Sequence, residues 1–393
     1  MNDILLLTSS VISDKCSSWL LLKKITSYVG KQNVVVYSIN GSKYNHEEDI
    51  NIIHRYTWLK SSFVRKLINK TQKKFTFKID KFISKRVYKD IIHIIKKENI
   101  KILWIYSDII PLLVVEKLVR ENVNIPFHVS VFDDPLTNIN FFMFEPLLNQ
   151  CVKLVLSKCK SIDVSSQYLF DKYVENGIIK DKLPFGITYG GEFRPIVTNN
   201  KTEIRQYVKK ICLTGNIFGI ESFITFIKSI KPICLEQNIF IDIYSNADSL
   251  SLLSLKYKFG EYSNFISFKP FVNEIFLDRL LLEYDLLLLP VSFSNSEREI
   301  AKSSFPSKTH NYLHSAVPIL LFSPKYAGIY NFLVEKKLCS VIDSDNPLII
   351  KKEFEMALDY DNRKKISANI YNFSTNNEIN THMLFLSDVI KSC

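Results

Sequence analysis

The sequence predicts an α/β fold made of two domains, each built around a parallel sheet. Short, continuous apolar runs alternate with longer segments of helical periodicity, which is the pattern of parallel strands covered by helices on both faces. The alternation breaks in the polar stretch 193–210 and then restarts, and 393 residues exceed one ordinary core. We therefore expect a first domain over residues 1–195 and a second over residues 196–361.

The first domain is expected to alternate strands and helices around one basic helical region. Its first helix ends near Gly30, a residue typical of helix ends. Strands are expected at 3–10, 33–39, 100–108 and 125–135, and helices at 15–30 and 109–122. Residues 152–177 are expected to form a strand, a loop with the cap candidate Ser165, and a helix.

The second domain repeats this alternation and ends in its most informative segment. Strands are expected at 211–217, 239–245, 265–271, 284–290 and 318–322, and helices at 219–238 and 273–284. Between the last two strands, a polar loop leads to a helix that opens with Pro306, Ser307 and Lys308. Unpaired helical N–H groups and the helix dipole make such a start an anion site, and a diphosphate is its natural ligand.

The cysteines and the N-terminus predict a protein of the cytoplasm. Seven scattered cysteines, an odd number without any C-x-x-C spacing, argue against a disulfide framework or a zinc site. The N-terminus lacks the basic and long apolar regions of a signal peptide. No window approaches the roughly eighteen uninterrupted apolar residues that a membrane span needs. We expect a protein that is neither secreted nor integral to a membrane.

Two segments of the second domain resemble the donor-nucleotide site of the GT-B glycosyltransferases that build bacterial surface polysaccharides. They are "EYDLLLLP" at 283–290 and "FPSKTHNYLHSAVPIL" at 305–320. The sequence departs from that group at three positions. Ser303 and Asn311 stand where the two glutamates of its E-x7-E motif usually lie, and Ala316 replaces a glycine.

The resemblance implies an activity as well as a fold. The fold would have two Rossmann-like domains with a cleft between them, and the segment 362–393 would be a helix that crosses back to the first domain. The activity would be that of a hexosyltransferase-like, retaining enzyme. It would move a sugar from a nucleotide-sugar donor to a glycan or lipid-linked acceptor of lipopolysaccharide, capsule or a related polysaccharide. Enzymes of this type generally need no metal or other cofactor.

Four positions are candidates for holding the donor phosphates. Ser307 and Lys308 lie at the helix start, where an ammonium and N–H groups would stabilise a leaving diphosphate; an exposed first-turn lysine is the alternative. Gly215 and Asn216 lie at a strand-to-helix turn, where a missing Cβ lets the backbone approach a ligand; a plain turn is the alternative.

Two further positions are candidates for other parts of the donor. Asn311 offers both a donor and an acceptor to the ribose or sugar, unless it is an ordinary surface residue. Arg298 can reach the phosphates from its loop, with a solvated charge as the equal alternative. Tyr312 and Leu313 are expected to pack the helix against the sheet. His310 and His314 have the spacing of a metal pair but no visible third ligand, so we expect no metal site.

In the first domain, Asp133 and Asp134 are the catalytic candidates. They follow a buried strand and precede Pro135, where the resembled family faces its acceptor. Many relatives have a histidine where this chain has Phe132, so one of the two carboxylates would orient the acceptor hydroxyl or take its proton. A turn or helix-capping aspartate is the alternative. His128 is expected to be a core histidine.

The segment from Lys60 to Lys97 holds thirteen basic and two acidic residues, although the net charge of the whole chain is only +11. Its apolar residues recur at helical spacing, which is typical of an amphipathic surface that lies on anionic lipid. Plain solvated helices are one alternative and a nucleic-acid surface is another, but no nucleic-acid-binding motif accompanies the charge. We expect peripheral attachment to the inner face of the cell membrane and no nucleic-acid partner.

Two other functions remain open. The missing E-x7-E glutamates and histidine favour a GT-B protein that has lost turnover and serves as a binding or scaffold subunit. A sugar-nucleotide epimerase on a similar two-domain fold would explain the nucleotide site but not the basic surface.

Overall fold

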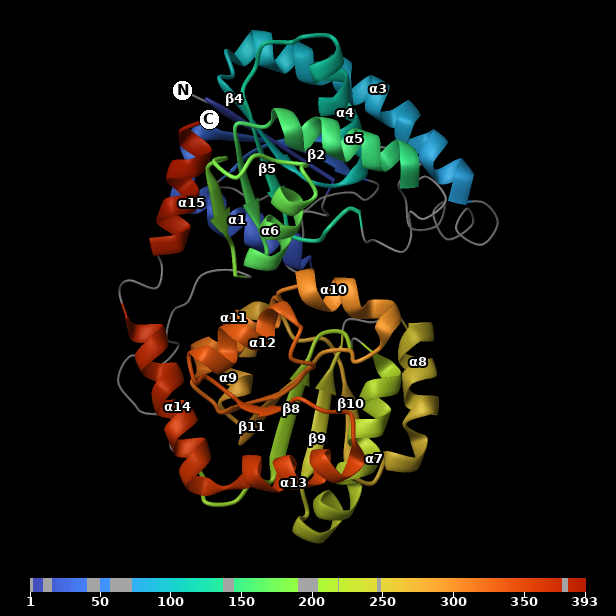
Figure 1. The fold of residues 1–393 in the computed structure, drawn as a ribbon, viewed down its shortest axis with the longest axis vertical. Helices are drawn as coiled ribbons and strands as arrows, with labels where there is room; N and C mark the ends of the chain where they lie inside the picture. The colour runs from blue at the N-terminus through green and yellow to red at the C-terminus, as the bar shows by residue number, and fades with distance from the viewer. Residues whose placement is uncertain are drawn as a thin grey trace. The chain divides into compact units, whose positions relative to one another are not determined.

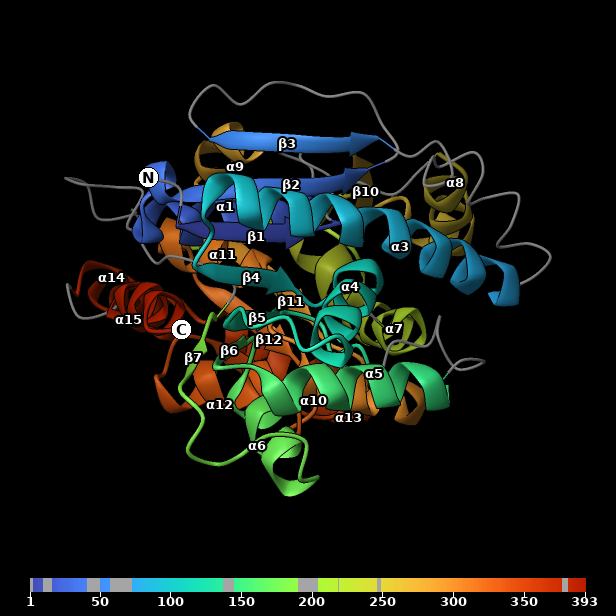
Figure 2. The ribbon, with the colours of Figure 1, turned by 90° about the horizontal axis from the view of Figure 1, so that it is seen from above.

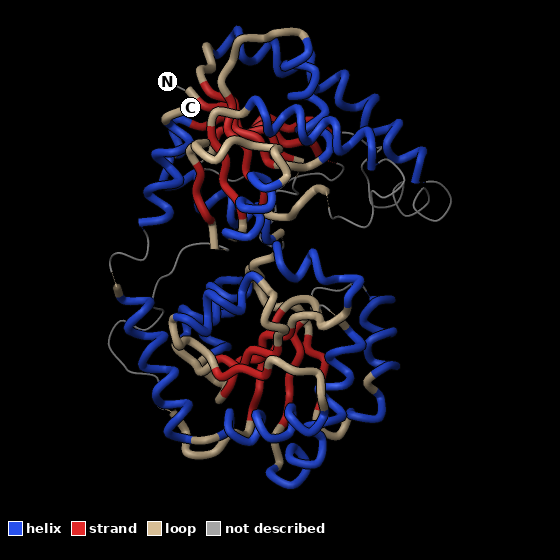
Figure 3. Tube along the Cα trace, viewed as in Figure 1, coloured by secondary structure: helices blue, strands red, loops and turns tan. Residues whose placement is uncertain are grey.

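The computed structural model describes residues 3–9, 16–40, 50–56, 73–136, 145–189, 204–217, 219–245, 249–376 and 381–393. It divides into two compact units, one of Met1–Thr188 with Thr381–Cys393 and one of Tyr189–Asn380. Each unit has a parallel sheet with helices on both faces, which confirms the α/β class (Figure 1, Figure 3). The boundary expected between residues 195 and 196 lies outside the described residues.

The sheet of the first unit has seven parallel strands in the order β3-β2-β1-β4-β5-β6-β7. Figure 2 shows β3, β2, β1 and β4 side by side. The strands are β1 (Ile4–Thr8), β2 (Val34–Asn40), β3 (Asn51–Tyr56), β4 (Ile102–Tyr106), β5 (Phe127–Val131), β6 (Ser161–Val164) and β7 (Phe185–Ile187).

Helices cover both faces of this first sheet. They are α1 (Ser17–Val29), α3 (Lys73–Glu98), α4 (Ile109–Arg120), α5 (Glu145–Lys158), α6 (Gln167–Glu175) and α15 (Thr381–Lys391). α3, α4 and α5 bury their apolar sides in one core cluster, and α1 and α15 bury theirs in another. The Ser161 hydroxyl donates to the Val389 carbonyl of α15 at 3.1 Å, so the last helix is joined to β6, beside the edge strand β7.

One expected strand of the first unit is a helix. Residues 152–158 belong to α5, whereas the sequence suggested a strand there. The reason is visible in the burial: Leu148, Cys151, Val152, Val155 and Leu156 are all buried, which is the i, i+3, i+4, i+7 spacing of one helix face. The cap position before α6 is Ser166 rather than Ser165.

The second unit has six parallel strands in the order β10-β9-β8-β11-β12-β13. They are β8 (Lys210–Thr214), β9 (Phe240–Tyr244), β10 (Ile266–Lys269), β11 (Leu286–Pro290), β12 (Ile319–Phe322) and β13 (Ser340–Ile342). The continuous apolar run of β11 is buried at every position, as a central strand covered on both faces requires.

Helices again cover both faces of the second sheet. They are α7 (Ile220–Gln237), α8 (Ser249–Lys258), α9 (Glu274–Leu281), α10 (Arg298–Ser303), α11 (Lys308–Ser315), α12 (Gly328–Glu335), α13 (Pro347–Leu358) and α14 (Tyr360–Thr375). α7 and α13 share one core cluster, and α9, α11, α12 and α14 share the other. The described residues of the C-terminal segment form two helices, α14 in the second unit and α15 in the first.

Candidate functional site

The candidate donor site lies at the carboxyl ends of β8 and β11, which are neighbours in the second sheet. From β8 the chain passes through α7 to β9 on one side, and from β11 it passes through α10 and α11 to β12 on the other. Strands whose connections leave in opposite directions form a topological switch point, the usual place for a ligand in an open parallel sheet.

The turn after β8 contains two glycines with left-handed backbone. Gly215 has a φ of 75°, and its N–H donates to the Tyr244 carbonyl at 2.7 Å. Gly219 has a φ of 68° and precedes the first residue of α7. A Cβ on Gly219 would lie 2.5 Å from the Cβ of Ser292, so only glycine fits there. Sequence reasoning missed Gly219, although a second glycine just before a helix was a signal for it.

Lys308 is the first residue of α11, and Ser307 before it is exposed. The Lys308 Nζ donates to the carbonyl of Asn216 at 3.1 Å. A Cβ on Gly215 would lie 3.7 Å from the Lys308 Cε. The structure thus brings Gly215, Asn216 and Lys308 together, with Ser307 adjacent in the chain. All four expected phosphate-binding positions therefore lie in one group around the Lys308 ammonium.

The environment of Lys308 makes its ammonium easier to deprotonate than usual. The residue as a whole is half-buried, but its Nζ is surrounded closely enough that desolvation lowers the pKa to about 8. The nearby Cys212 thiol acts in the opposite direction. The ammonium has lost part of its hydration, and a bound anion would replace the interactions that it has lost with water.

The other expected donor residues have different surroundings. Asn311 is buried on α11, three residues after Lys308. Arg298 begins α10, and its guanidinium lies 4.6 Å from the ring centroid of Tyr326. Ser303 is buried, and its hydroxyl donates to the Glu299 and Ile300 carbonyls of its own helix. Asn311 thus shares α11 with Lys308, whereas Arg298 and Ser303 contact other residues of the second unit.

Tyr312 packs α11 against the sheet, as expected. Its side chain is fully buried. The hydroxyl accepts from the Thr214 N–H at 2.9 Å and donates to the Leu288 carbonyl at 3.3 Å. Leu313 is also fully buried. Both expectations for these two residues are confirmed.

In the first unit, Asp133 and Asp134 follow β5 and have opposite environments. Asp133 is exposed, although partial desolvation still raises the pKa of its carboxyl. Asp134 is buried and accepts from the Tyr173 hydroxyl at 2.8 Å and the Lys172 ammonium at 3.1 Å. The Leu136 N–H donates to it as well. Asp134 therefore joins this turn to α6, and Asp133 is the carboxylate that a second molecule can reach.

His128 is a core histidine, as expected. It is fully buried in β5, with its Nδ1 2.8 Å from the Ser161 hydroxyl and its Nε2 2.5 Å from Asp163. Ser130 also donates to Asp163 and accepts from the Trp104 indole at 2.8 Å. The residues form a buried polar network centred on the Asp163 Oδ1 atom, and the Oδ2 atom of Asp163 has no hydrogen-bond partner in the part of the chain that the structure describes.

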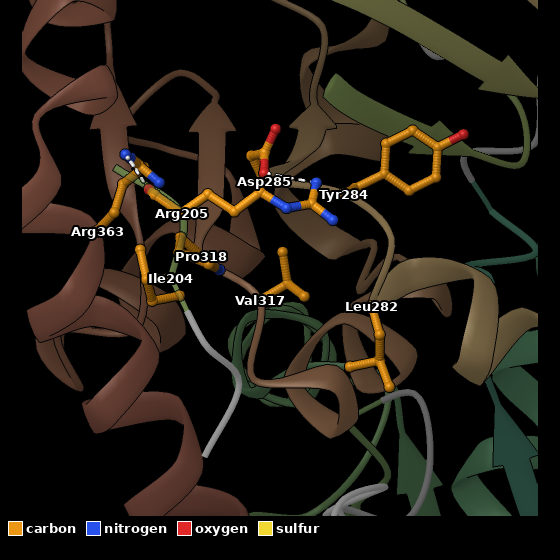
Figure 4. A pocket seen from close by; sticks show the side chains of 8 residues that line it. All are labelled: Ile204, Arg205, Leu282, Tyr284, Asp285, Val317, Pro318 and Arg363. Carbon is orange, nitrogen blue, oxygen red and sulfur yellow. Dashed lines mark hydrogen bonds and ion pairs between the residues drawn. The ribbon is translucent and has the colours of Figure 1, made fainter. Parts of the chain in front are cut away.

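A small polar pocket of about 30 Å³ opens at the amino-terminal ends of β8, β11 and β12, opposite to the candidate donor site (Figure 4). Asp285 accepts from Arg205 at 3.0 Å and from the Lys209 and Lys210 N–H groups at 2.8 Å each. The buried Arg363 guanidinium donates to the Arg205 and Gln206 carbonyls. These bonds attach α14 and the entering chain to the sheet, and the volume suits a water molecule.

Neither a metal-ligand cluster nor a membrane-spanning helix occurs in the part of the chain that the structure describes. No three His, Cys, Asp or Glu side chains there are grouped as ligands for a metal ion. Helices long and apolar enough to cross a membrane are not found among the same residues. The rings of His310 and His314 lie 5.6 Å apart.

Comparison with protein-family models gives no match, and comparison with curated protein sequences gives none either. Comparison with solved structures is informative. The fold is that of the GT-B glycosyltransferases, with two Rossmann-like domains, as the sequence predicted.

Three solved structures illustrate the likeness. A glycosyltransferase from Rickettsia africae is 14% identical with a TM-score of 0.61, over 99% of each chain. WaaG, a glycosyltransferase involved in lipopolysaccharide biosynthesis, is 12% identical with a TM-score of 0.65, over 99% of this chain and 100% of its own. S. aureus MnaA, solved with UDP, is 10% identical with a TM-score of 0.56, over 97% of this chain and 96% of its own.

Proposed function

We propose that the protein is a glycosyltransferase that moves a sugar from a nucleotide donor to a lipid-linked or surface-glycan acceptor, with retention of anomeric configuration. The observation that carries this proposal is the contact between Lys308 and the Gly215–Asn216 turn at the switch point of the second sheet. An ammonium beside a glycine turn and a helix start suits a diphosphate, the leaving group of such a transfer. The neighbours WaaG and MnaA, named for glycosyl transfer and for bound UDP, agree with this chemistry.

In this proposal each unit has one task. The second unit binds the nucleotide sugar through Ser307, Lys308 and the Gly215–Asn216 turn, with Asn311 toward the ribose or sugar. The first unit supplies the acceptor side, where exposed Asp133 orients the acceptor hydroxyl or takes its proton. The main catalytic effect is electrostatic stabilisation of the departing diphosphate by Lys308 and the N–H groups around it.

The test is ligand-induced thermal stabilisation with UDP, GDP, dTDP and CMP sugars, followed by a search for donor turnover. We expect one nucleotide class to raise the melting temperature of the wild type but not of Lys308→Ala. Lys351→Ala, which removes an exposed lysine on α13, is the matched control and should respond as the wild type does. No shift with any nucleotide would refute the donor site.

Turnover then separates the candidate functions. Hydrolysis of the donor, or its transfer to an added lipid-linked glycan, supports the glycosyltransferase. Binding without either reaction supports the scaffold subunit. The absence of the E-x7-E glutamates is the reason to consider that function. Conversion of a free nucleotide sugar into its epimer would identify an epimerase instead.

We also propose that α3 attaches the enzyme to an anionic membrane surface on the cytoplasmic side. Between Phe77 and Glu98, the exposed side chains are Lys78, Lys81, Phe82, Lys85, Arg86, Lys89, His93, Lys96 and Lys97. The three acidic residues of that stretch are buried or half-buried, so its exposed lysine and arginine side chains have no exposed acidic neighbour within the stretch. Residues 60–72 of the expected basic segment lie outside the described residues.

The membrane proposal has its own test. Each basic residue near anionic lipid contributes about 1 kcal/mol before screening. Reversing Lys81, Lys85 and Lys89 to glutamate should therefore abolish sedimentation with phosphatidylglycerol vesicles at low salt. Reversal of Lys351 and Lys352 on α13 is the control and should have little effect. Equal sedimentation of the α3 variant and the wild type would refute the proposal.

A further inference from the structure

The pairing between β8 and β11 ends abruptly beside the candidate donor site. Ile211 lies opposite Leu286 and Cys212 opposite Leu287, and the ladder stops there. At the next step of a parallel ladder, the Thr214 N–H would bond to the Leu288 carbonyl. The Tyr312 hydroxyl lies between these two groups instead, accepting from Thr214 at 2.9 Å and donating to Leu288 at 3.3 Å.

The hydroxyl of Tyr312 makes all the hydrogen bonds that a phenol can make, two as acceptor and one as donor. The Thr214 hydroxyl lies 3.3 Å away and donates to it as well, so the phenol oxygen accepts two hydrogen bonds and donates one. The side chain is completely buried, and burial raises the pKa of the phenol, which therefore keeps the proton that it donates. Because the inserted hydroxyl is hydrogen-bonded to both β8 and β11, it fixes the distance between the two strands at this point.

Tyr312 also belongs to the helix that carries Lys308. The two residues are four apart in α11, so their side chains lie on one face of the helix. Thr214, the partner of Tyr312, directly precedes Gly215, which lies beside the Lys308 side chain, and Asn216, whose carbonyl accepts from Lys308. One helix face thus meets the end of β8 at two successive points, first through a buried phenol and then through an ammonium.

We propose that Tyr312 is the positioning residue of the Lys308 site. Its hydroxyl replaces one ladder bond, holds the ends of β8 and β11 apart, and sets the distance between Lys308 and the Gly215–Asn216 turn. The effect of Tyr312 on nucleotide binding rests on the proposed donor site, whereas the hydrogen bonds by which Tyr312 bridges β8 and β11 do not depend on it.

The test uses Tyr312→Phe, which keeps the ring and removes the bridge. Binding of UDP, GDP and dTDP is measured by calorimetry, and the nucleotide that binds wild type is then used for all variants. We expect affinity about tenfold weaker in Tyr312→Phe, because the Thr214 N–H loses its buried partner and the turn beside Lys308 shifts. We also expect the pH at which binding weakens to move, since Lys308 would have new surroundings; a merely structural tyrosine would leave that pH unchanged.

Tyr284→Phe is the matched control. Tyr284 is buried in the same unit, and its hydroxyl donates to Asp242 at 2.8 Å and lies 2.8 Å from the Tyr244 hydroxyl. Its loss should lower stability comparably and leave nucleotide affinity unchanged. The proposal is overturned if Tyr312→Phe binds as the wild type does, or if both variants weaken binding equally.

A second measurement decides the matter if Tyr312→Phe does not fold. Hydrogen exchange of the Thr214 amide in the wild type should be slow without any nucleotide, because the phenol already accepts that hydrogen. Exchange at the rate of an exposed amide would overturn the proposal. A wild type that binds no nucleotide but protects this amide would refute the donor site and leave the bridge intact, so the two failures are distinguishable.

Discussion

Nucleotide binding should weaken as the pH rises past the pKa of Lys308, which desolvation lowers to about 8. Only the ammonium form attracts a diphosphate, and above about pH 7 the diphosphate itself no longer changes its charge. With that pKa, the charged fraction falls from about nine-tenths at pH 7 to about one-tenth at pH 9. The dissociation constant should therefore rise about tenfold, or about 1.4 kcal/mol. A lysine with an ordinary pKa would remain charged and show no change.

Calorimetric titration of three proteins at a constant ionic strength checks this. Wild type should lose affinity between about pH 7 and about pH 9, with half of the change near the pKa of Lys308. Lys308→Arg should bind equally at both values, because a guanidinium stays charged. Lys308→Ala should bind weakly at both. Wild-type affinity that is constant over this range, with Lys308→Ala still weak, would show that the ammonium is better solvated than its surroundings indicate.

Three further predictions concern single positions. Gly219→Ala should lower the free energy of unfolding by about 2–4 kcal/mol, because its Cβ meets Ser292 and its φ is left-handed; a loss under about 1 kcal/mol in denaturant unfolding would contradict this. Ala316→Gly should stabilise by about 0.5–1 kcal/mol, because Ala316 has a φ of 54°, and an unchanged melting temperature would count against it. Asp133→Asn should reduce donor turnover about 100-fold without loss of stability, whereas Asp134→Asn should cost about 1–3 kcal/mol of stability and keep turnover; the reverse result would exchange their roles.

The main elements of the fold could be predicted because the local pattern of apolar residues indicates which elements are buried. β11 is a run of leucines that only a strand covered on both faces can bury. Four strands escaped prediction: three lie at sheet edges, β3 as "NIIHRY", β7 as "FGI" and β13 as "SVI", and the fourth, β6, lies beside the edge strand β7. Edge strands bury less and depend on their neighbour for pairing, so their own composition says little.

The site was predictable where its chemistry is local and not where it depends on distant contacts. Lys308 follows from a strand, a loop and a helix start in consecutive sequence. The need for glycine at Gly219 comes from Ser292, far along the chain, and the local sequence shows only that a glycine precedes a helix. Asp133 and Asp134 are adjacent, and which one is buried is decided by α6, whose Lys172 and Tyr173 bond to Asp134.

Asn311 offers a final test of why the pKa of Lys308 is low. It lies three residues after Lys308 on α11, where side chains are close neighbours, and the sequence resemblance places it where the second E-x7-E glutamate would be. A glutamate there would favour the charged ammonium, whereas the neutral amide leaves burial as the dominant influence.

Asn311→Glu should therefore raise the pH at which nucleotide binding weakens, even though the added negative charge lowers affinity overall. Asn311→Gln, which is neutral and of the same length as glutamate, is the control and should keep the wild-type pH. The pH of half-maximal loss, rather than the affinity, is the quantity to compare. If nucleotide binding to Asn311→Glu and to Asn311→Gln weakens at the same pH, the carboxylate does not reach Lys308, and the neutral amide at this position is not what leaves the ammonium easy to deprotonate.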